Sequence, residues 1–154
     1  MIELVYISEA SHPFSLSELQ DLLTQARLKN ASLDITGLLL YSEESQRFIQ
    51  VLEGDEYEVN RIYDAIVDDP RHTNVRLLGS NKITQRDFSD WRMGFSLIDD
   101  TLPEWPGVSD FLAQSAKPGQ YLSEPYQFGR QMLMFFRERL KQNRSENDAS
   151  HINR

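Results

Sequence analysis

Two short apolar runs, residues 35–41 and 48–54, most strongly constrain how this chain can fold. Each run has the length of a β-strand, and the polar residues between them are typical of a turn, so the pattern predicts a β-hairpin. Gln50 interrupts the second run, although Phe48 and Leu52 on the same strand face are hydrophobic. An unpaired buried amide costs about 1–3 kcal/mol. Gln50 therefore either bonds nearby backbone groups or faces a polar ligand held against the sheet.

Hydrophobic periodicity predicts a first strand, a helix, the hairpin, a second helix and two further strands. This βαββαββ order favours an α+β, ferredoxin-like fold with a mixed five-stranded sheet and both helices on one face. The expected bounds are 2–8 for the first strand, 15–30 for the first helix, 54–69 for the second helix, and 75–82 and 91–98 for the last two strands.

Local signals set the ends of the two helices. A capping box, Ser15 with Glu18, opens the first helix, and its apolar stripe begins at Leu16. Asn30 is expected to form the C-terminal turn of that helix. The stripe of the second helix reaches Val67, and Pro70 ends it. In the last strand, four apolar residues are expected to share one face: Trp91, Met93, Phe95 and Leu97.

The character of the sequence changes beyond residue 98, where two more helices are expected. The last of them carries the uninterrupted apolar run 132–136, which needs neighbours on several sides. That run predicts packing on the open face of the sheet, burial in a second subunit, or both, and hence a homo-oligomer. The expected organisation is one domain over 1–98, a helical extension over 99–144 and a disordered tail over 145–154.

Composition excludes several classes of function. The net charge of −8 argues against direct binding to nucleic acid or to a membrane surface. The chain has no cysteine, and its three histidines do not stand at ligand spacing, so no metal site is expected. No phosphate-binding glycine motif or nucleophile elbow is present, which predicts that the chain is not an enzyme. The start lacks a signal-peptide pattern, so a cytoplasmic protein is expected.

A few polar residues would converge on one side of the expected sheet. Tyr6 lies in the first strand, Asn30 at the end of the first helix and Gln50 in the hairpin, while Asp69 and His72 follow the second helix. Each has a plain structural alternative, such as a helix cap for Asn30. Together they offer a phenol and two carboxamides, which suit an aromatic heterocycle that carries carbonyls and ring nitrogens.

The chain resembles the BLUF family, sensors of blue light using FAD, from about residue 2 to residue 98. Five segments carry the resemblance, in order: Leu4-Val5-Tyr6-Ile7-Ser8, Asn30 with Ile35-Thr36-Gly37-Leu38-Leu39, Phe48-Ile49-Gln50-Val51-Leu52-Glu53-Gly54, Asp69-Pro70-Arg71-His72, and Trp91-Arg92-Met93. The region after them is similar to that of short family members in which two helices follow the sensor domain. Two positions depart from common family patterns: Lys29 precedes Asn30, and Ala26 stands where a serine is frequent.

The resemblance implies FAD as cofactor and gives roles to residues of this chain. Tyr6 would be the electron and proton donor to the excited flavin, and Gln50 would bridge the Tyr6 hydroxyl and the ring. Asn30 would hydrogen-bond the ring, which Leu22 and Ile66 would clamp from the two helices. Further cofactor-binding positions are Arg27, Asp69, Arg71 and His72, and the signal relay would lie at Met93 and Trp91.

The implied function is a blue-light photoreceptor in which a rearranged Gln50 hydrogen-bond network shifts the absorption reversibly to the red. The signal would pass through contacts with a protein partner that the sequence does not name. The alternative is a light-independent flavin-binding enzyme or an adaptor of the same fold. Whether Trp91 or Met93 lies next to Gln50 stays open at this point.

Overall fold

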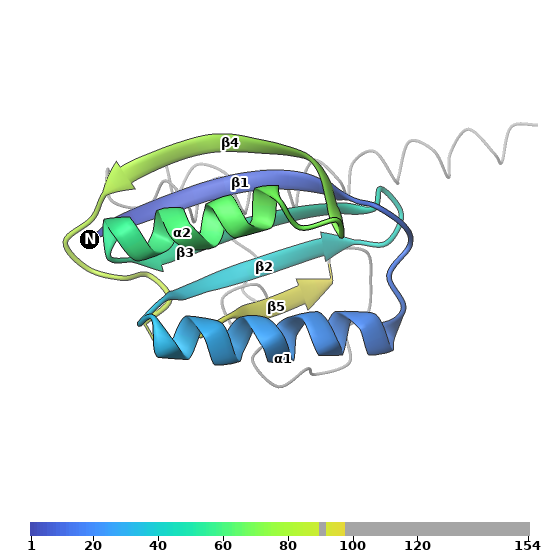
Figure 1. The fold of residues 1–154 in the computed structure, drawn as a ribbon, viewed down its shortest axis with the longest axis horizontal. Helices are drawn as coiled ribbons and strands as arrows, with labels where there is room; N and C mark the ends of the chain where they lie inside the picture. Colours follow the sequence, from blue (N-terminus) through green and yellow to red (C-terminus); the bar gives the residue numbers. More distant parts are fainter. Residues whose placement is uncertain (90–91, 98–154) are drawn as a thin grey trace, which may run out of the picture.

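The computed structural model describes residues 1–89 and 92–97, which form a five-stranded sheet covered on one face by two helices (Figure 1). In chain order the elements are β1 (Ile2–Ala10), α1 (Leu16–Ser32), β2 (Thr36–Ser42), β3 (Arg47–Gly54), α2 (Glu56–Val67), β4 (His72–Lys82) and β5 (Gly94–Leu97). The predicted α+β, ferredoxin-like fold with a mixed sheet is thereby confirmed.

The strand order β4-β1-β3-β2-β5 places β3 at the centre of the sheet. β3 runs antiparallel to β1 and to β2, and β1 runs antiparallel to β4. Each helix therefore connects two parallel strands that are separated by one antiparallel strand. Right-handed crossovers place both helices on the same face of such a sheet. β5 pairs with β2 in parallel, which makes the sheet mixed.

One row of paired residues crosses the whole sheet, and we call it the central row. It runs from edge to edge through Leu77, Tyr6, Gln50, Leu39 and Phe95. Because paired residues in neighbouring strands project to the same face, Tyr6 and Gln50 point together toward the helices, where both are in the core.

The core between sheet and helices follows the predicted stripes except at their ends. Leu19, Leu22 and Leu23 of α1 are buried against the sheet. Leu16 is 54% exposed and Val67 is 47% exposed, so the two stripes are shorter than expected. Both are terminal residues of their helices.

The end of α1 differs from the expected one. The helix continues through Asn30 to Ser32, and the buried Asn30 accepts backbone hydrogen bonds from the N–H groups of Leu33 and Ile35. Asp34, not Asn30, adopts the left-handed conformation that ends such a helix, with φ of 53°. Aspartate tolerates this conformation better than most residues do, so the left-handed turn lies at Asp34, four residues later than expected.

Two strands also have different bounds from those expected. β1 extends to Ala10, which pairs with His72, and β4 therefore begins three residues earlier than expected. β5 begins at Gly94. Within the described part of that face, Met93 and Phe95 are both buried in the core, as predicted.

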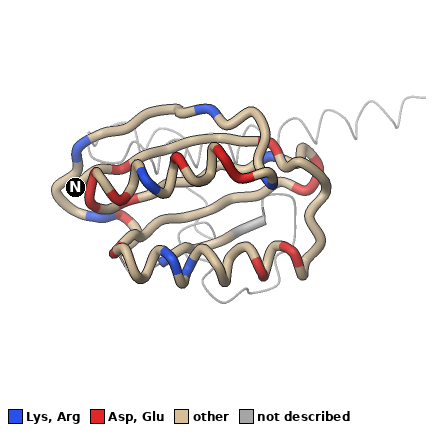
Figure 2. The backbone as a smooth tube through the Cα atoms, viewed as in Figure 1, with Lys and Arg blue, Asp and Glu red and all other residues tan. Residues whose placement is uncertain are grey.

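Several expectations lie outside the described residues and stay predictions. They concern Trp91, the helical extension over 99–144 and the tail over 145–154. In the described part, neither helix has both the length and the apolar character needed to cross a bilayer. Aspartate and glutamate residues lie along α2 and near the beginning of α1, whose later part carries basic residues (Figure 2).

Candidate functional site

A cavity of about 260 Å³ lies between α1 and α2, with the sheet as its floor. It is lined by residues of both helices, of four strands and of the turn after α2: Tyr6, Leu22, Gln25, Ala26, Lys29, Asn30, Leu39, Gln50, Ile62, Ala65, Ile66, Asp69, Arg71 and His72. Most of the site residues expected from the sequence are in this set. Arg27 and Met93 are not, although both bond to groups beside the cavity.

Tyr6, Gln50 and Met93 form a buried hydrogen-bonded chain at the cavity floor. The Tyr6 hydroxyl donates to Gln50 Oε1, and Gln50 Nε2 donates to the Met93 sulfur at 3.0 Å. Tyr6 and Met93 are each 1% exposed, and Gln50 is 5% exposed. Both ends of the amide are thus paired. Among the described residues, Met93 is therefore the neighbour of Gln50.

The environment of Tyr6 keeps its hydroxyl protonated. Burial, and then the negative charge of Asp69, raise the pKa of Tyr6 far above its ordinary value. A protonated phenol is a hydrogen-bond donor, so the Gln50 carbonyl oxygen is its matched acceptor. The Tyr63 ring packs 5.7 Å from the Tyr6 ring, centroid to centroid, and completes an aromatic wall beside the cavity.

Two side chains of α1 hold the backbone just before β5. Asn30 Nδ2 donates to the Arg92 carbonyl at 2.8 Å, and Arg27 Nε donates to the Met93 carbonyl at 3.0 Å. Asn30 also lines the cavity. This helix therefore connects the cavity to the residue that contacts Gln50.

Asp69, Arg71 and His72 lie where the chain leaves α2 and enters β4. Arg71 Nη2 pairs with Asp69 Oδ2 at 2.6 Å, and Arg71 Nη1 donates to Gln25 Oε1 of α1 at 3.3 Å. This contact bridges the two helices at the cavity. The side chain of Ser8 bonds His72 Nδ1 at 2.8 Å and fixes the ring beside Tyr6.

His72 makes folding stability depend on pH. Burial lowers its pKa from 6.5 to about 4, with Asp69 opposing and Arg71 assisting. Between these values only the unfolded chain binds the proton, so the stabilisation is complete above pH 6.5 and is lost as the pH falls toward 4. The loss is at most about 3 kcal/mol. Urea unfolding of the wild type and of His72→Asn between pH 7 and 4.5 measures it. Equal pH dependence of the two proteins would contradict the prediction.

Some lining residues were not expected from the sequence as ligand contacts. They are Gln25, Lys29, Leu39, Ile62 and Ala65. Helical spacing places them near expected residues: Gln25 and Lys29 are three and seven positions after Leu22 on α1, and Ile62 is four before Ile66 on α2. A helical-wheel projection around Leu22 and Ile66 would therefore have identified Gln25, Lys29 and Ile62.

The lining suits a flat ring that carries carbonyls and nitrogens. Leucine, isoleucine and alanine side chains from the helices face a floor of phenol and carboxamide groups. The volume of about 260 Å³ is slightly below the range of about 300–1,000 Å³ usual for ligand pockets. The volume therefore suits a compact ring system. Fold and cavity together define a ferredoxin-like ligand-binding domain.

The family model for sensors of blue light using FAD matches residues 1–94. Because the match covers more than half of the 154 residues, the chain belongs to this family, known as BLUF. The resemblance stated from the sequence motifs is confirmed.

Similar proteins and structures carry the same kind of domain. The photoactivated adenylate cyclase subunit beta of Euglena longa is 36% identical over 115 residues, which are 74% of this chain and 13% of that protein. The blue light- and temperature-regulated antirepressor BluF of Escherichia coli (strain K12) is 34% identical over 66% of this chain and 24% of that protein. Among solved structures, a bacterial light-regulated adenylyl cyclase has 36% identity and a TM-score of 0.61, covering 68% of this chain and 29% of that chain.

The BLUF protein BlrB in its dark state is 29% identical with a TM-score of 0.59, covering 62% of this chain and 71% of that chain. By contrast, the chain spans only about an eighth of the length of the cyclase subunit and a quarter of that of the antirepressor.

Proposed function

We propose that this protein is a blue-light photoreceptor that binds FAD in the cavity between α1 and α2. The observation that carries the proposal is the buried hydrogen bond between Tyr6 and Gln50 at the cavity floor. A phenol next to an amide whose two ends are both hydrogen-bonded is a switchable pair, because the two ends of an amide have opposite bonding character.

The cavity residues divide the task of holding the cofactor. Leu22 of α1 and Ile66 of α2 would pack against the flavin ring, and Gln50 and Asn30 would offer it hydrogen bonds. Arg71, held by Asp69, and His72, held by Ser8, would bind a polar part of the cofactor. Arg27 acts less directly, because it holds the Met93 carbonyl.

A bound flavin absorbs blue light and, once excited, supplies a one-electron oxidant. Tyr6 would give one electron and its Oη proton to this oxidant and would take both back when the dark state returns. Gln50 would meanwhile exchange the roles of its amide ends, by rotation or tautomerisation. With its ends exchanged, Gln50 would no longer donate to the Met93 sulfur, and its changed hydrogen bond to the flavin would shift the absorption to the red.

The signal leaves the domain through protein contacts. BLUF proteins signal to downstream partners, and the Escherichia coli relative is named an antirepressor. We propose the same mode here, with no catalytic activity in the described domain and with a homo-oligomer formed through the apolar run 132–136. Light scattering before and after illumination measures the assembly; a monomer at high concentration refutes the oligomer. The cytoplasmic location expected from the sequence stays a prediction.

An absorption spectrum of the purified protein before and after blue light tests the function. We expect a flavin spectrum that moves slightly to the red, since a changed hydrogen bond perturbs the absorption without altering the chromophore covalently, and that returns in the dark. A flavin that only bleaches supports a light-independent flavoenzyme, and a colourless protein that takes up no flavin supports an adaptor.

Chromatography of the flavin released by heat tests the cofactor. One solved relative, Klebsiella pneumoniae BlrP1, is described with FMN, so the choice between the two flavins needs a direct measurement. We expect FAD, and we expect reconstituted FAD and FMN forms to give the same red shift. The enclosed residues contact the ring, which both flavins share.

A further inference from the structure

The residues before β5 are attached to the sheet by a buried carboxylate. Glu53, the penultimate residue of β3, is 1% exposed. Its Oε1 accepts from the Asp87 N–H at 2.6 Å, and its Oε2 accepts from the Phe88 N–H at 3.1 Å and from Thr36 Oγ1 at 2.9 Å. A carboxylate can accept at both oxygens, whereas an amide can accept at only one. This position therefore requires the acid.

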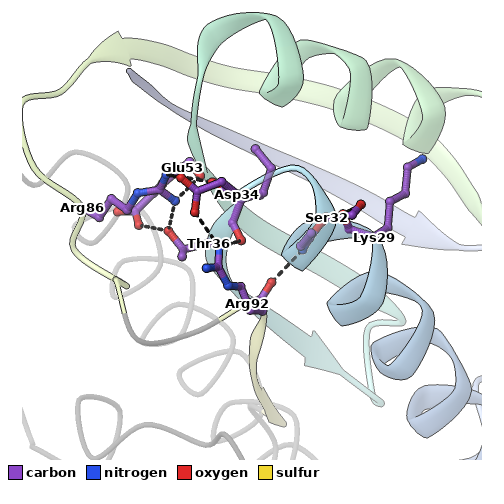
Figure 3. Close-up of polar contacts among 9 residues, drawn as sticks. Lys29, Ser32, Asp34, Thr36, Glu53, Arg86 and Arg92 are labelled. Carbon is purple, nitrogen blue, oxygen red and sulfur yellow. Dashed lines mark hydrogen bonds and ion pairs between the residues drawn. The ribbon is translucent and has the colours of Figure 1, made fainter.

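A second carboxylate joins two arginines from the same part of the chain (Figure 3). Asp34 occupies the left-handed turn between α1 and β2. Its Oδ1 accepts from Arg92 at 2.8 Å and its Oδ2 from Arg86 at 3.1 Å. Arg86 also donates to the carbonyls of Asp34 and Glu53, at 2.7 and 3.2 Å. We call Asp34, Glu53, Arg86 and Arg92 the clasp.

The clasp ends one residue before Met93, which contacts Gln50. Arg92 precedes Met93, whose sulfur accepts from Gln50 Nε2 at 3.0 Å. The backbone at both positions is also held by α1, through Asn30 and Arg27. Arg92 is therefore joined by a single peptide bond to the residue that Gln50 contacts.

Within the clasp, the buried Glu53 and the mostly buried Arg86 stabilise the fold, whereas the Asp34–Arg92 pair contributes little to stability. The Asp34 side chain is 76% exposed and that of Arg92 is 44% exposed, and exposed ion pairs contribute little to folding. The same pair nevertheless fixes the orientation of a residue adjacent to a fully buried core methionine. Its effect on position thus exceeds its effect on folding free energy.

We propose that the clasp holds Met93 against the Gln50 amide and thereby favours the resting arrangement of the Tyr6–Gln50–Met93 chain. The light-dependent half of this proposal rests on the proposed function, and the static half does not. Asp34, Glu53, Arg86 and Arg92 are positioning residues: none of them lines the cavity. Weakening the clasp should loosen Met93 in the dark and slow the return to the dark spectrum.

The test compares three flavin-loaded variants of the full chain with the wild type. Asp34→Asn keeps a residue that tolerates φ of 53° and removes the charge that both arginines share. Glu53→Gln removes one acceptor oxygen. Arg61→Gln breaks the exposed Glu58–Arg61 pair on α2 and is the matched control. Thermal unfolding shows that each variant folds, and Asp34→Asn keeps the proposal testable if Glu53→Gln does not.

Two readouts are measured: the methyl resonance of Met93 in protein labelled with ¹³C-methyl methionine, assigned through Met93→Leu, and the rate of dark recovery. We expect Asp34→Asn to move or broaden the Met93 resonance in the dark and to slow recovery by up to about fivefold, the change in rate that corresponds to the loss of an exposed ion pair. The control should change neither. A Met93 resonance at its wild-type position, or recovery as fast as in the wild type, overturns the proposal. If the wild type shows no photoresponse, the proposed function fails and the dark Met93 resonance alone decides.

Discussion

Tyr6→Phe is expected to retain bound flavin and to abolish the light-induced red shift. The substitution removes the hydroxyl group of Tyr6, which donates to Gln50 and carries the only proton that Tyr6 can release. The phenyl ring keeps its packing against Tyr63, so the cavity wall persists. Loss of the hydrogen bond leaves Gln50 Oε1 without this donor and lowers the free energy of unfolding by about 1–2 kcal/mol. Difference absorption spectra and urea unfolding measure the two effects.

The matched control for that experiment is Tyr63→Phe. Tyr63 is half-buried beside Tyr6 but lies on α2, and it takes no part in the Tyr6–Gln50–Met93 chain. This variant should keep the red shift with its wild-type amplitude. A normal photoresponse in Tyr6→Phe would show that Tyr6 is not the donor. Loss of the response in both variants would point instead to a general disturbance of the cavity wall.

The second large effect is expected from Gln50→Leu. Leucine nearly fills the space of glutamine but has no amide, so hydrogen bonds to both Tyr6 and Met93 are lost. The flavin should still bind, because the contacts from Leu22 and Ile66 are unchanged. The red shift should disappear, because Tyr6 then has no amide partner that can exchange a donor for an acceptor. A reversible red shift of wild-type size would contradict the proposed mechanism.

Asn60→Ala provides a comparison for the loss of an amide. Asn60 is an exposed residue of α2 whose Nδ2 donates to the Glu56 carbonyl in the same helix. Its replacement should leave both the dark spectrum and the photoresponse unchanged. Together with Gln50→Leu it separates the effect of one particular amide from that of a small loss of stability.

Periodicity predicted the elements well because their apolar faces are long. The hairpin 35–54 and the fold class needed only short-range patterns and the βαββαββ sequence of elements. The end of α1 was predicted less well, because Asn30 and Asp34 both suit a left-handed turn and only the packed structure chooses between them. Burial of Leu16 was overestimated because a helical stripe carries no information on where its neighbours end.

The cavity was predictable from the sequence to a larger extent than the clasp was. Tyr6, Gln50 and His72 belong to recognisable motifs, and all three line the cavity. Glu53 was visible only as an acid at the end of an apolar strand, and the two backbone N–H groups that it accepts from, those of Asp87 and Phe88, lie more than 30 residues later in a region without periodicity. The place of Met93 beside Gln50 could not be derived, because strand alternation allows neighbouring apolar residues to compete for one site.

The central row indicates where a probe of Gln50 can be attached without altering the cavity. Gln50 is backbone-paired on both sides, to Tyr6 and to Leu39, so the strand itself is clamped and only the amide is free to respond. The same row emerges at one margin of the sheet as Leu77, which is 51% exposed. A fluorophore or a spin label attached there would sit two strands from the amide while leaving the cavity untouched. Position 77 is thus a suitable site for a probe that reports changes near Gln50.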